Sequence, residues 1–143
     1  MPPLDFMPYE LRYKYPHMAP ADKAIWERFI VANPSAFDSV AYDVPVGIGT
    51  DMDTVVNPET GGDINKLYQR KIDVVAVKDG KLFVVELKPR ASTAALGQVQ
   101  GYVVLFKRDY QVGVPVNPVV ITDELLPDME FLAKDAKVNL VVV

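Results

Sequence analysis

Residues 71 to 90 read KIDVVAVKDGKLFVVELKPR, and this stretch decides the fold. Two runs of mainly apolar residues flank the dipeptide Asp79-Gly80. That dipeptide favours a type I′ turn, because both central positions of such a turn need positive φ. The stretch therefore predicts a β-hairpin, and counting outward from its turn places Asp73 opposite Glu86.

The predicted hairpin has one apolar face and one face that ends in charge. The apolar face is formed by Ile72, Val74, Ala76, Phe83, Val85 and Leu87. The other face carries apolar residues near the turn and, farther from it, Asp73, Glu86 and Lys88. Because both faces are largely apolar, we expect an interior hairpin with helices on each side.

The opposed carboxylates of Asp73 and Glu86 need a positive partner. Like charges directly across a strand pair are destabilising, and burial of the charges adds to that cost. A divalent cation such as Mg²⁺ suits the position, since it takes carboxylate oxygens together with water and phosphate. The alternative is that the strand ends reach solvent, where both carboxylates are solvated or paired with Lys71, Lys88 and Arg90.

The segments around the hairpin predict a layered domain. Helical spacing is found in residues 20–34, 93–110 and 127–137, and strand patterns in residues 37–49, 117–125 and 138–143. Residues 50–66 are turn-rich and acidic, which is typical of a surface loop, and Asp51 and Asp53 fit loop solvation. The order is α-β-β-β-α-β-α-β, an α/β or α+β layered architecture with a mixed central sheet and helices on both faces. Residues 1–19 are expected to form an irregular arm ahead of a single domain, residues 20–143.

Composition narrows the classes of function. The chain of 143 residues has no cysteine and a single histidine, His17. This excludes disulfides, a cysteine nucleophile and a zinc site built on cysteine or histidine. The net charge of −4 is not that of a broadly basic nucleic-acid-binding chain, although basic residues can still gather on one face. No apolar run approaches the ~20 residues of a membrane helix, and the chain does not open with a signal-peptide pattern.

The segment IDVVAVKDGKLFVVELKPRASTAALGQVQGY, residues 72–102, resembles the core of the PD-(D/E)XK nuclease superfamily, in its resolvase-like or mismatch-endonuclease-like branch. The aspartate of the superfamily motif falls on Asp73, and the ExK element falls on Glu86 and Lys88. Ile72 stands where the name-giving proline would be, at a position that is loose in the superfamily. The resemblance implies a restriction-endonuclease-like core for most of the chain.

The resemblance also reaches the helices. Several branches carry a helical ALGQxxxY pattern, which matches Gln98 and Tyr102, and resolvase-like branches carry a first-helix glutamate, for which Glu27 is the natural match. Gln98 and Tyr102 lie four residues apart and therefore share a helix face. Gly97 and Gly101 form a neighbouring row that could let the helix lie close to the sheet. The alternatives are a solvated Glu27, an exposed Gln98 and a Tyr102 that only packs.

This resemblance implies a divalent-metal-dependent DNA endonuclease that hydrolyses phosphodiester bonds. Asp73, Glu86 and the backbone carbonyl of Leu87 would hold Mg²⁺ or Mn²⁺. Lys88 would orient the attacking water and stabilise developing negative charge, with Gln98 and Tyr102 at the edge of the site. Such an enzyme would be of bacterial or phage type and would act in DNA repair, recombination or phage DNA processing. A structure-specific DNA substrate is one option. The expected location is the cytoplasm of the cell or infected host.

DNA is the expected partner, and a local basic rim is the expected contact. The rim residues are Lys66, Arg70, Lys71, Arg90, Lys107 and Arg108. The alternative is that these charges near strand and helix ends are only solvated. A homodimer is a further option, and no membrane is expected. Two rival functions stay open: a non-catalytic relative that binds nucleic acid or a partner protein, and an assembly protein whose arm docks on a neighbour.

Overall fold

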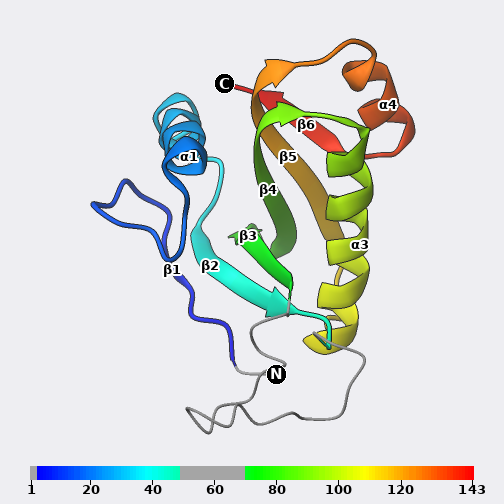
Figure 1. Ribbon diagram of the computed structural model, residues 1–143. Coiled ribbons are helices and arrows are strands. Elements are labelled where there is room, and N and C mark those ends of the chain that lie inside the picture. The colour runs from blue at the N-terminus through cyan, green and yellow to red at the C-terminus, as the bar shows by residue number, and fades with distance from the viewer. Residues whose placement is uncertain (1–2, 49–69) are drawn as a thin grey trace, which may run out of the picture.

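The computed structural model describes residues 3–48 and 70–143. A six-stranded sheet of order β1-β2-β3-β4-β5-β6 stands between helices on its two faces (Figure 1). Strands β1 to β4 pair antiparallel, whereas β4, β5 and β6 pair parallel, so the sheet is mixed as predicted. The loop predicted over residues 50–66, with Asp51, Asp53 and Lys66, lies outside the described residues.

The elements follow the predicted order, with one short strand added at the start. They are β1 (Met7–Pro8), α1 (Pro20–Ala32), β2 (Ser39–Val46), β3 (Arg70–Lys78), β4 (Lys81–Ala91), α3 (Thr93–Asp109), β5 (Val116–Leu125), α4 (Met129–Asp135) and β6 (Asn139–Val142). Strand β1 lies in the segment expected to be an irregular arm, where Met7 pairs with Val40 of β2. Among the described helices, none is long and apolar enough to cross a membrane.

The β3–β4 hairpin has the predicted turn and the predicted register. Asp79 and Gly80 both have positive φ, 49° and 75°, as a type I′ turn requires. The backbone ladder runs from this turn as far as Val74 opposite Val85. Asp73 and Glu86 therefore come one step beyond the last paired residues.

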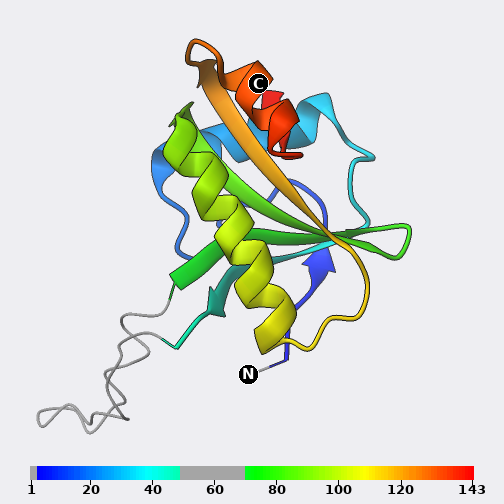
Figure 2. The same ribbon diagram turned by 90° about the vertical axis from the view of Figure 1, so that its right-hand side faces the viewer.

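Two apolar cores fill the space between the sheet and its helices. On one face, Trp26 of α1 belongs to a buried cluster with Val74 and Leu87. On the other face, Phe106 of α3 lies in a buried cluster with Val84 and with residues of α4. Figure 2 shows α3 crossing the near face of the sheet, with α1 behind it. The hairpin is covered on both sides, as its apolar faces predict.

Ile72 is not on the face that strict alternation predicts. It lies in the same core as Val75, under α3, whereas Val74 lies in the core under α1. The change of face occurs opposite Asp43 of β2, which has a φ of +53° and is flanked by the residues that pair with Ile72 and Val74. A left-handed residue interrupts the two-residue alternation at this point of the sheet, so on β3 the predicted apolar face ends at Val74, whereas on β4 it continues to Leu87.

Gly97 and Gly101 do not have the role predicted for them. Both are exposed on α3, and a Cβ added to either would meet no atom within 4 Å. The prediction that they let the helix lie close to the sheet is therefore wrong. Instead, α3 packs through the side chains on its buried stripe, which include Ala95, Val99 and Phe106.

The turn and the helix glycines should respond oppositely to alanine. Gly80→Ala places a Cβ in a left-handed conformation, and we expect it to lower the free energy of unfolding by about 1–2 kcal/mol. Gly101→Ala removes backbone freedom at an open helical position and should raise that free energy by about 0.5–1 kcal/mol. Urea denaturation of the two variants and the wild type measures both changes. Two shifts of the same sign would contradict this account of the turn.

Candidate active site

The carboxylates of Asp73 and Glu86 lie where strands β3 and β4 leave their ladder. The Asp73 N–H donates a hydrogen bond to Glu86 Oε1, with an N–O distance of 3.3 Å. In return, the Leu87 N–H donates to Asp73 Oδ2 at 2.9 Å. Each side chain thus takes the place of a strand carbonyl as acceptor for an amide of the opposite strand, which fixes both carboxyl groups between the strands.

Burial and mutual repulsion favour the protonated form of this pair. The Glu86 side chain is only 2% exposed. Its burial, and next the negative charge of Asp73, raise the pKa of Glu86 to about 9. Burial likewise raises the pKa of Asp73, against the opposing effect of the Leu87 N–H. A pKa of Glu86 this far above its ordinary value means that the pair binds a proton at neutral pH.

Lys88 supplies the nearby positive charge. It is half-buried and follows Glu86 by two residues on β4, so both side chains belong to the same side of the strand. Its charge lowers the pKa values of Asp73 and Glu86, although burial outweighs this effect in both. The structure thus brings together the three residues of the predicted motif.

Asp22 of α1 is a further acidic group beside the pair, and sequence reasoning missed it. Its negative charge raises the pKa of Asp73, and its own pKa is raised by burial and lowered by Lys88. A signal for it exists in the sequence: Asp22 precedes Trp26 by four residues and therefore extends the apolar stripe of α1. A carboxylate on the stripe that faces the sheet indicates a site.

Glu27, the first-helix residue predicted for the site, lies elsewhere on α1. Five residues separate it from Asp22, which turns its side chain by about 140° around the helix axis. Its Oε2 accepts a hydrogen bond from the hydroxyl of Tyr15 at 3.1 Å. It lines a shallow groove with Leu11 and Val31. Among the described α1 acids, Asp22 and not Glu27 shares the electrostatic environment of Asp73.

Gln98 and Tyr102 approach the carboxylates from α3. Gln98 Nε2 donates to the hydroxyl of Tyr102 at 2.9 Å. Tyr102 is buried, and the charges of Glu86 and Asp73 help to raise the pKa of its hydroxyl. Gln100 points away, since its Nε2 donates to the backbone carbonyl of Ala136 at 3.1 Å. The face of α3 that carries Gln98 is therefore the face toward the site.

The predicted rim residues differ in their surroundings. Arg70 lies close enough to Tyr102 for its charge to lower the pKa of that hydroxyl. Arg90 Nε is 3.1 Å from Glu124 Oε2, and Arg108 Nε is 2.7 Å from Asp109 Oδ1. The two lysines of the rim, Lys71 and Lys107, are exposed and make no ion pair with another residue of the described ranges.

The donor set fits a hard divalent cation. Within residues 3–48 and 70–143, no three histidine, cysteine or acidic side chains gather as a complete protein ligand set. Mg²⁺ does not require one, because it keeps several waters and is held by one or two carboxylates. Asp73 and Glu86 offer two such carboxylates; burial first, and for Glu86 next the negative charge of Asp73, raises their pKa values, and a bound cation would offset both effects.

Comparison with solved structures finds folds of the same kind at low identity. A repair endonuclease from Pyrococcus abyssi has 20% identity and a TM-score of 0.50, over 92% of this chain and 49% of the other. The protein of unknown function AF1548 has 14% identity and a TM-score of 0.53, over 84% and 56%. The EndoMS–dsDNA2 complex has 18% identity and a TM-score of 0.48, over 94% and 48%. This chain thus spans about half the length of these proteins.

The family of this chain is shown by a match to a family model, whereas the solved structures show only the fold. A comparison with curated proteins found no match. The model described as the endonuclease NucS C-terminal domain matches residues 62–143, which are more than half of the chain. The matched residues include the whole β3–β4 hairpin and α3, and hence every group described above at the site except Asp22. The chain therefore belongs to the family of NucS C-terminal domains.

Proposed function

We propose that this domain is a divalent-metal-dependent DNA endonuclease with a PD-(D/E)XK site. The observation that carries the proposal is the pair of the buried Glu86 and the partly buried Asp73, held between two strands with Lys88 on the same side of β4. A domain that only binds nucleic acid has no physical need for two opposed carboxylates enclosed in this way. Membership of the NucS C-terminal domain family supports the same reading.

Asp73 and Glu86 are the residues that would hold the ion. When bound, Mg²⁺ or Mn²⁺ would neutralise charge on the scissile phosphate and lower the pKa of a water molecule. The backbone carbonyl of Leu87 is proposed as a third ligand, because the amide of the same residue already binds Asp73. Asp22 is placed to join this set through an intervening water, as a third negative charge beside the pair.

The remaining polar groups would act on water and phosphate. Lys88, as a compact positive charge beside the carboxylates, would orient the attacking water and stabilise the negative charge that develops on phosphate oxygens. The Gln98 amide can both donate and accept. Its bond to Tyr102 fixes its direction, so that its carbonyl oxygen can accept a hydrogen bond from that water and hold it in place.

DNA is the proposed substrate, held by a local rim and not by the overall charge. Arg70 and Lys71 begin β3 next to the site and are the rim residues best placed for a phosphate. Arg90 and Arg108 would first exchange their carboxylate partners for phosphate. Only a few phosphate contacts are then formed, which gives a shallow dependence of affinity on salt.

The carboxylate pair should make metal-free stability depend on pH. The pKa of Glu86 is higher in the folded state, at about 9, than in the unfolded chain. The folded state therefore binds more protons between roughly pH 4.3 and 9, and its stability falls as pH rises through this window. We expect Glu86→Gln in EDTA to match the wild type near pH 4 and to melt at a higher temperature by pH 8. A wild type that is as stable as the variant at pH 8 would contradict the burial argument.

Rates of DNA cleavage should distinguish variants of the site residues from variants of neighbouring residues. In Mg²⁺ or Mn²⁺, Lys88→Met should lower the turnover of a branched or mismatched DNA by ~10²–10³-fold, the scale of one lost electrostatic stabiliser. We expect Gln98→Ala to lower it at least ~10-fold, because the attacking water loses a contact that orients it. Gln100→Ala is the matched control, since its amide contacts Ala136. A panel of linear, nicked, branched and mismatched DNAs measures these rates.

Measurements of DNA binding on the same panel decide whether the domain is a nuclease or only binds DNA. Lys88→Met and Gln98→Ala should retain DNA binding, because neither change removes a rim residue. If the wild type binds these DNAs but cuts none of them with either metal ion, the domain is a non-catalytic binder. If Gln100→Ala is impaired as much as Gln98→Ala, the placement of the active face of α3 is wrong.

A further inference from the structure

Thr122 is a buried polar group that the proposed mechanism does not use. Among the described residues, the buried polar or charged side chains outside the aromatic class are Glu86 and Thr122. Thr122 lies on β5, where it pairs with Lys88 of β4 in the parallel register. Paired residues of neighbouring strands point to the same face, with backbones about 4.8 Å apart. The threonine is thus the lateral neighbour of the lysine in the site.

The Thr122 hydroxyl gives β4 a hydrogen bond to β5 near Pro89, a residue that cannot donate one. Pro89 follows Lys88 and has no N–H to donate to β5. Two residues later, the N–H of the fully buried Ala91 donates to Thr122 Oγ1 at 3.1 Å. The hydroxyl in turn donates to the backbone carbonyl of Glu124, also at 3.1 Å. One hydroxyl therefore joins the end of β4 to the end of β5.

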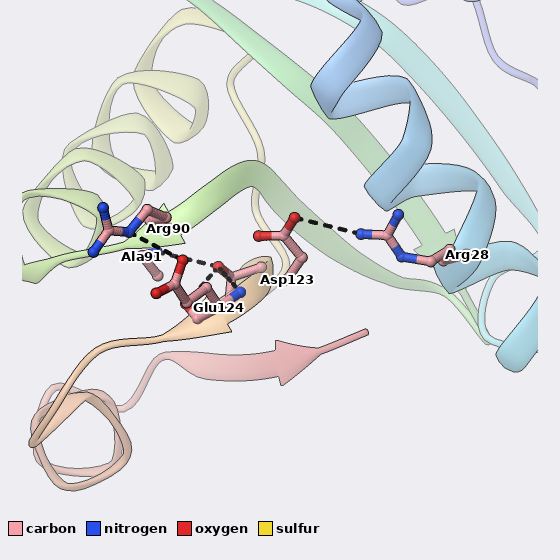
Figure 3. Close-up of polar contacts among 6 residues, drawn as sticks. Arg28, Arg90, Ala91, Asp123 and Glu124 are labelled. Carbon is pink, nitrogen blue, oxygen red and sulfur yellow. Dashed lines mark hydrogen bonds and ion pairs between the residues drawn. The ribbon is translucent and has the colours of Figure 1, made fainter.

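The same end of β5 makes two ion pairs, which Figure 3 shows on either side of it. Arg90 contacts Glu124, and Arg28 of α1 contacts Asp123 at 3.6 Å. Both pairs are exposed, with side chains 40% to 65% accessible. Exposed pairs contribute little to stability, whereas a buried amide left without its acceptor is costly. Of these side-chain contacts, the Thr122 hydroxyl is then the one that contributes most at this end of β4, beside the backbone pairing of Arg90 with Glu124 and of Ala91 with Leu125.

We propose that Thr122 is a positioning residue for Lys88. Its hydroxyl binds the amide of Ala91, three residues after the lysine, and so helps to fix the backbone of β4 beyond Pro89, which is left out of the pairing with β5. The side chain of Thr122 does not touch substrate and acts through Lys88. The inference rests on the proposed function, because positioning Lys88 matters to the reaction only if the lysine acts in it.

Two matched pairs of variants isolate the hydroxyl. Thr122→Val keeps the shape of threonine and loses the hydroxyl. Thr122→Ser and Thr122→Ala both lose the methyl group, and they differ from each other only in the hydroxyl. If the valine variant does not fold, the serine and alanine variants still give the comparison. Glu124→Gln serves as a control for the exposed ion pair at the same end of β5.

Turnover should depend on whether residue 122 carries a hydroxyl, and not on the stability of each variant. At a temperature where all variants are folded, we expect Thr122→Val and Thr122→Ala to lose at least tenfold in kcat, with KM and Mn²⁺ affinity within about twofold of the wild type. Thr122→Ser and Glu124→Gln should keep kcat within about threefold, although the serine variant has lost a buried methyl group. Equal kcat in the serine and alanine variants would overturn the proposal.

Amide hydrogen exchange tests the same contact without relying on activity. Loss of the hydroxyl should speed exchange at Lys88 and Ala91 at least tenfold in Thr122→Val and Thr122→Ala, and not in Thr122→Ser. Unchanged exchange in the valine and alanine variants would overturn the proposal even if turnover fell. If the wild type has no nuclease activity but the valine and alanine variants show these changes in exchange, the proposed function is refuted. The contact between Thr122 and β4 is then still established.

Discussion

The site depends on one constraint: two carboxylates share a gap that a hairpin leaves between its strands. Asp73 and Glu86 are anchored there by each other's strand, through the amides of Leu87 and Asp73. This anchoring keeps the carboxyl groups together although their negative charges repel. The helices then enclose the gap, with Asp22 of α1 and Tyr102 of α3 both close enough to exchange electrostatic effects with Asp73. The fold thus holds two mutually repelling carboxyl groups at a fixed and largely enclosed place.

The hairpin and its charged end could be predicted because their cause is local. Asp79-Gly80 sets the turn, the turn sets the register, and the register sets which residues face each other. The element order followed from periodicity in the same way. Asp22 could not be placed by motif, because only the angle of α1 against the sheet decides which of its acids reaches Asp73. Glu27 matched the motif, but its side chain lies on another face of α1, where it binds the hydroxyl of Tyr15.

Features that depend on tertiary contact escaped prediction for a similar reason. The change of face at Ile72 accompanies the left-handed Asp43 on the neighbouring strand, which no pattern within residues 71–90 can report. The position of Thr122 beside Lys88 needs the parallel pairing of β4 and β5, two strands separated in sequence by α3. The family match, over residues 62–143, covers the hairpin and these parallel strands, whereas α1 with Asp22 precedes it.

The most direct test of a metal site at Asp73 and Glu86 is calorimetric titration with Mn²⁺ at pH 7, in two buffers with different ionisation enthalpies. Because burial keeps a proton on the pair at that pH, binding of the ion must release it. We expect about one proton released per ion bound by the wild type, and weak binding without release by Glu86→Gln. Glu27→Gln, which removes the same charge elsewhere on the domain, should behave like the wild type. Binding without proton release, or equal affinity in Glu86→Gln, would contradict the account.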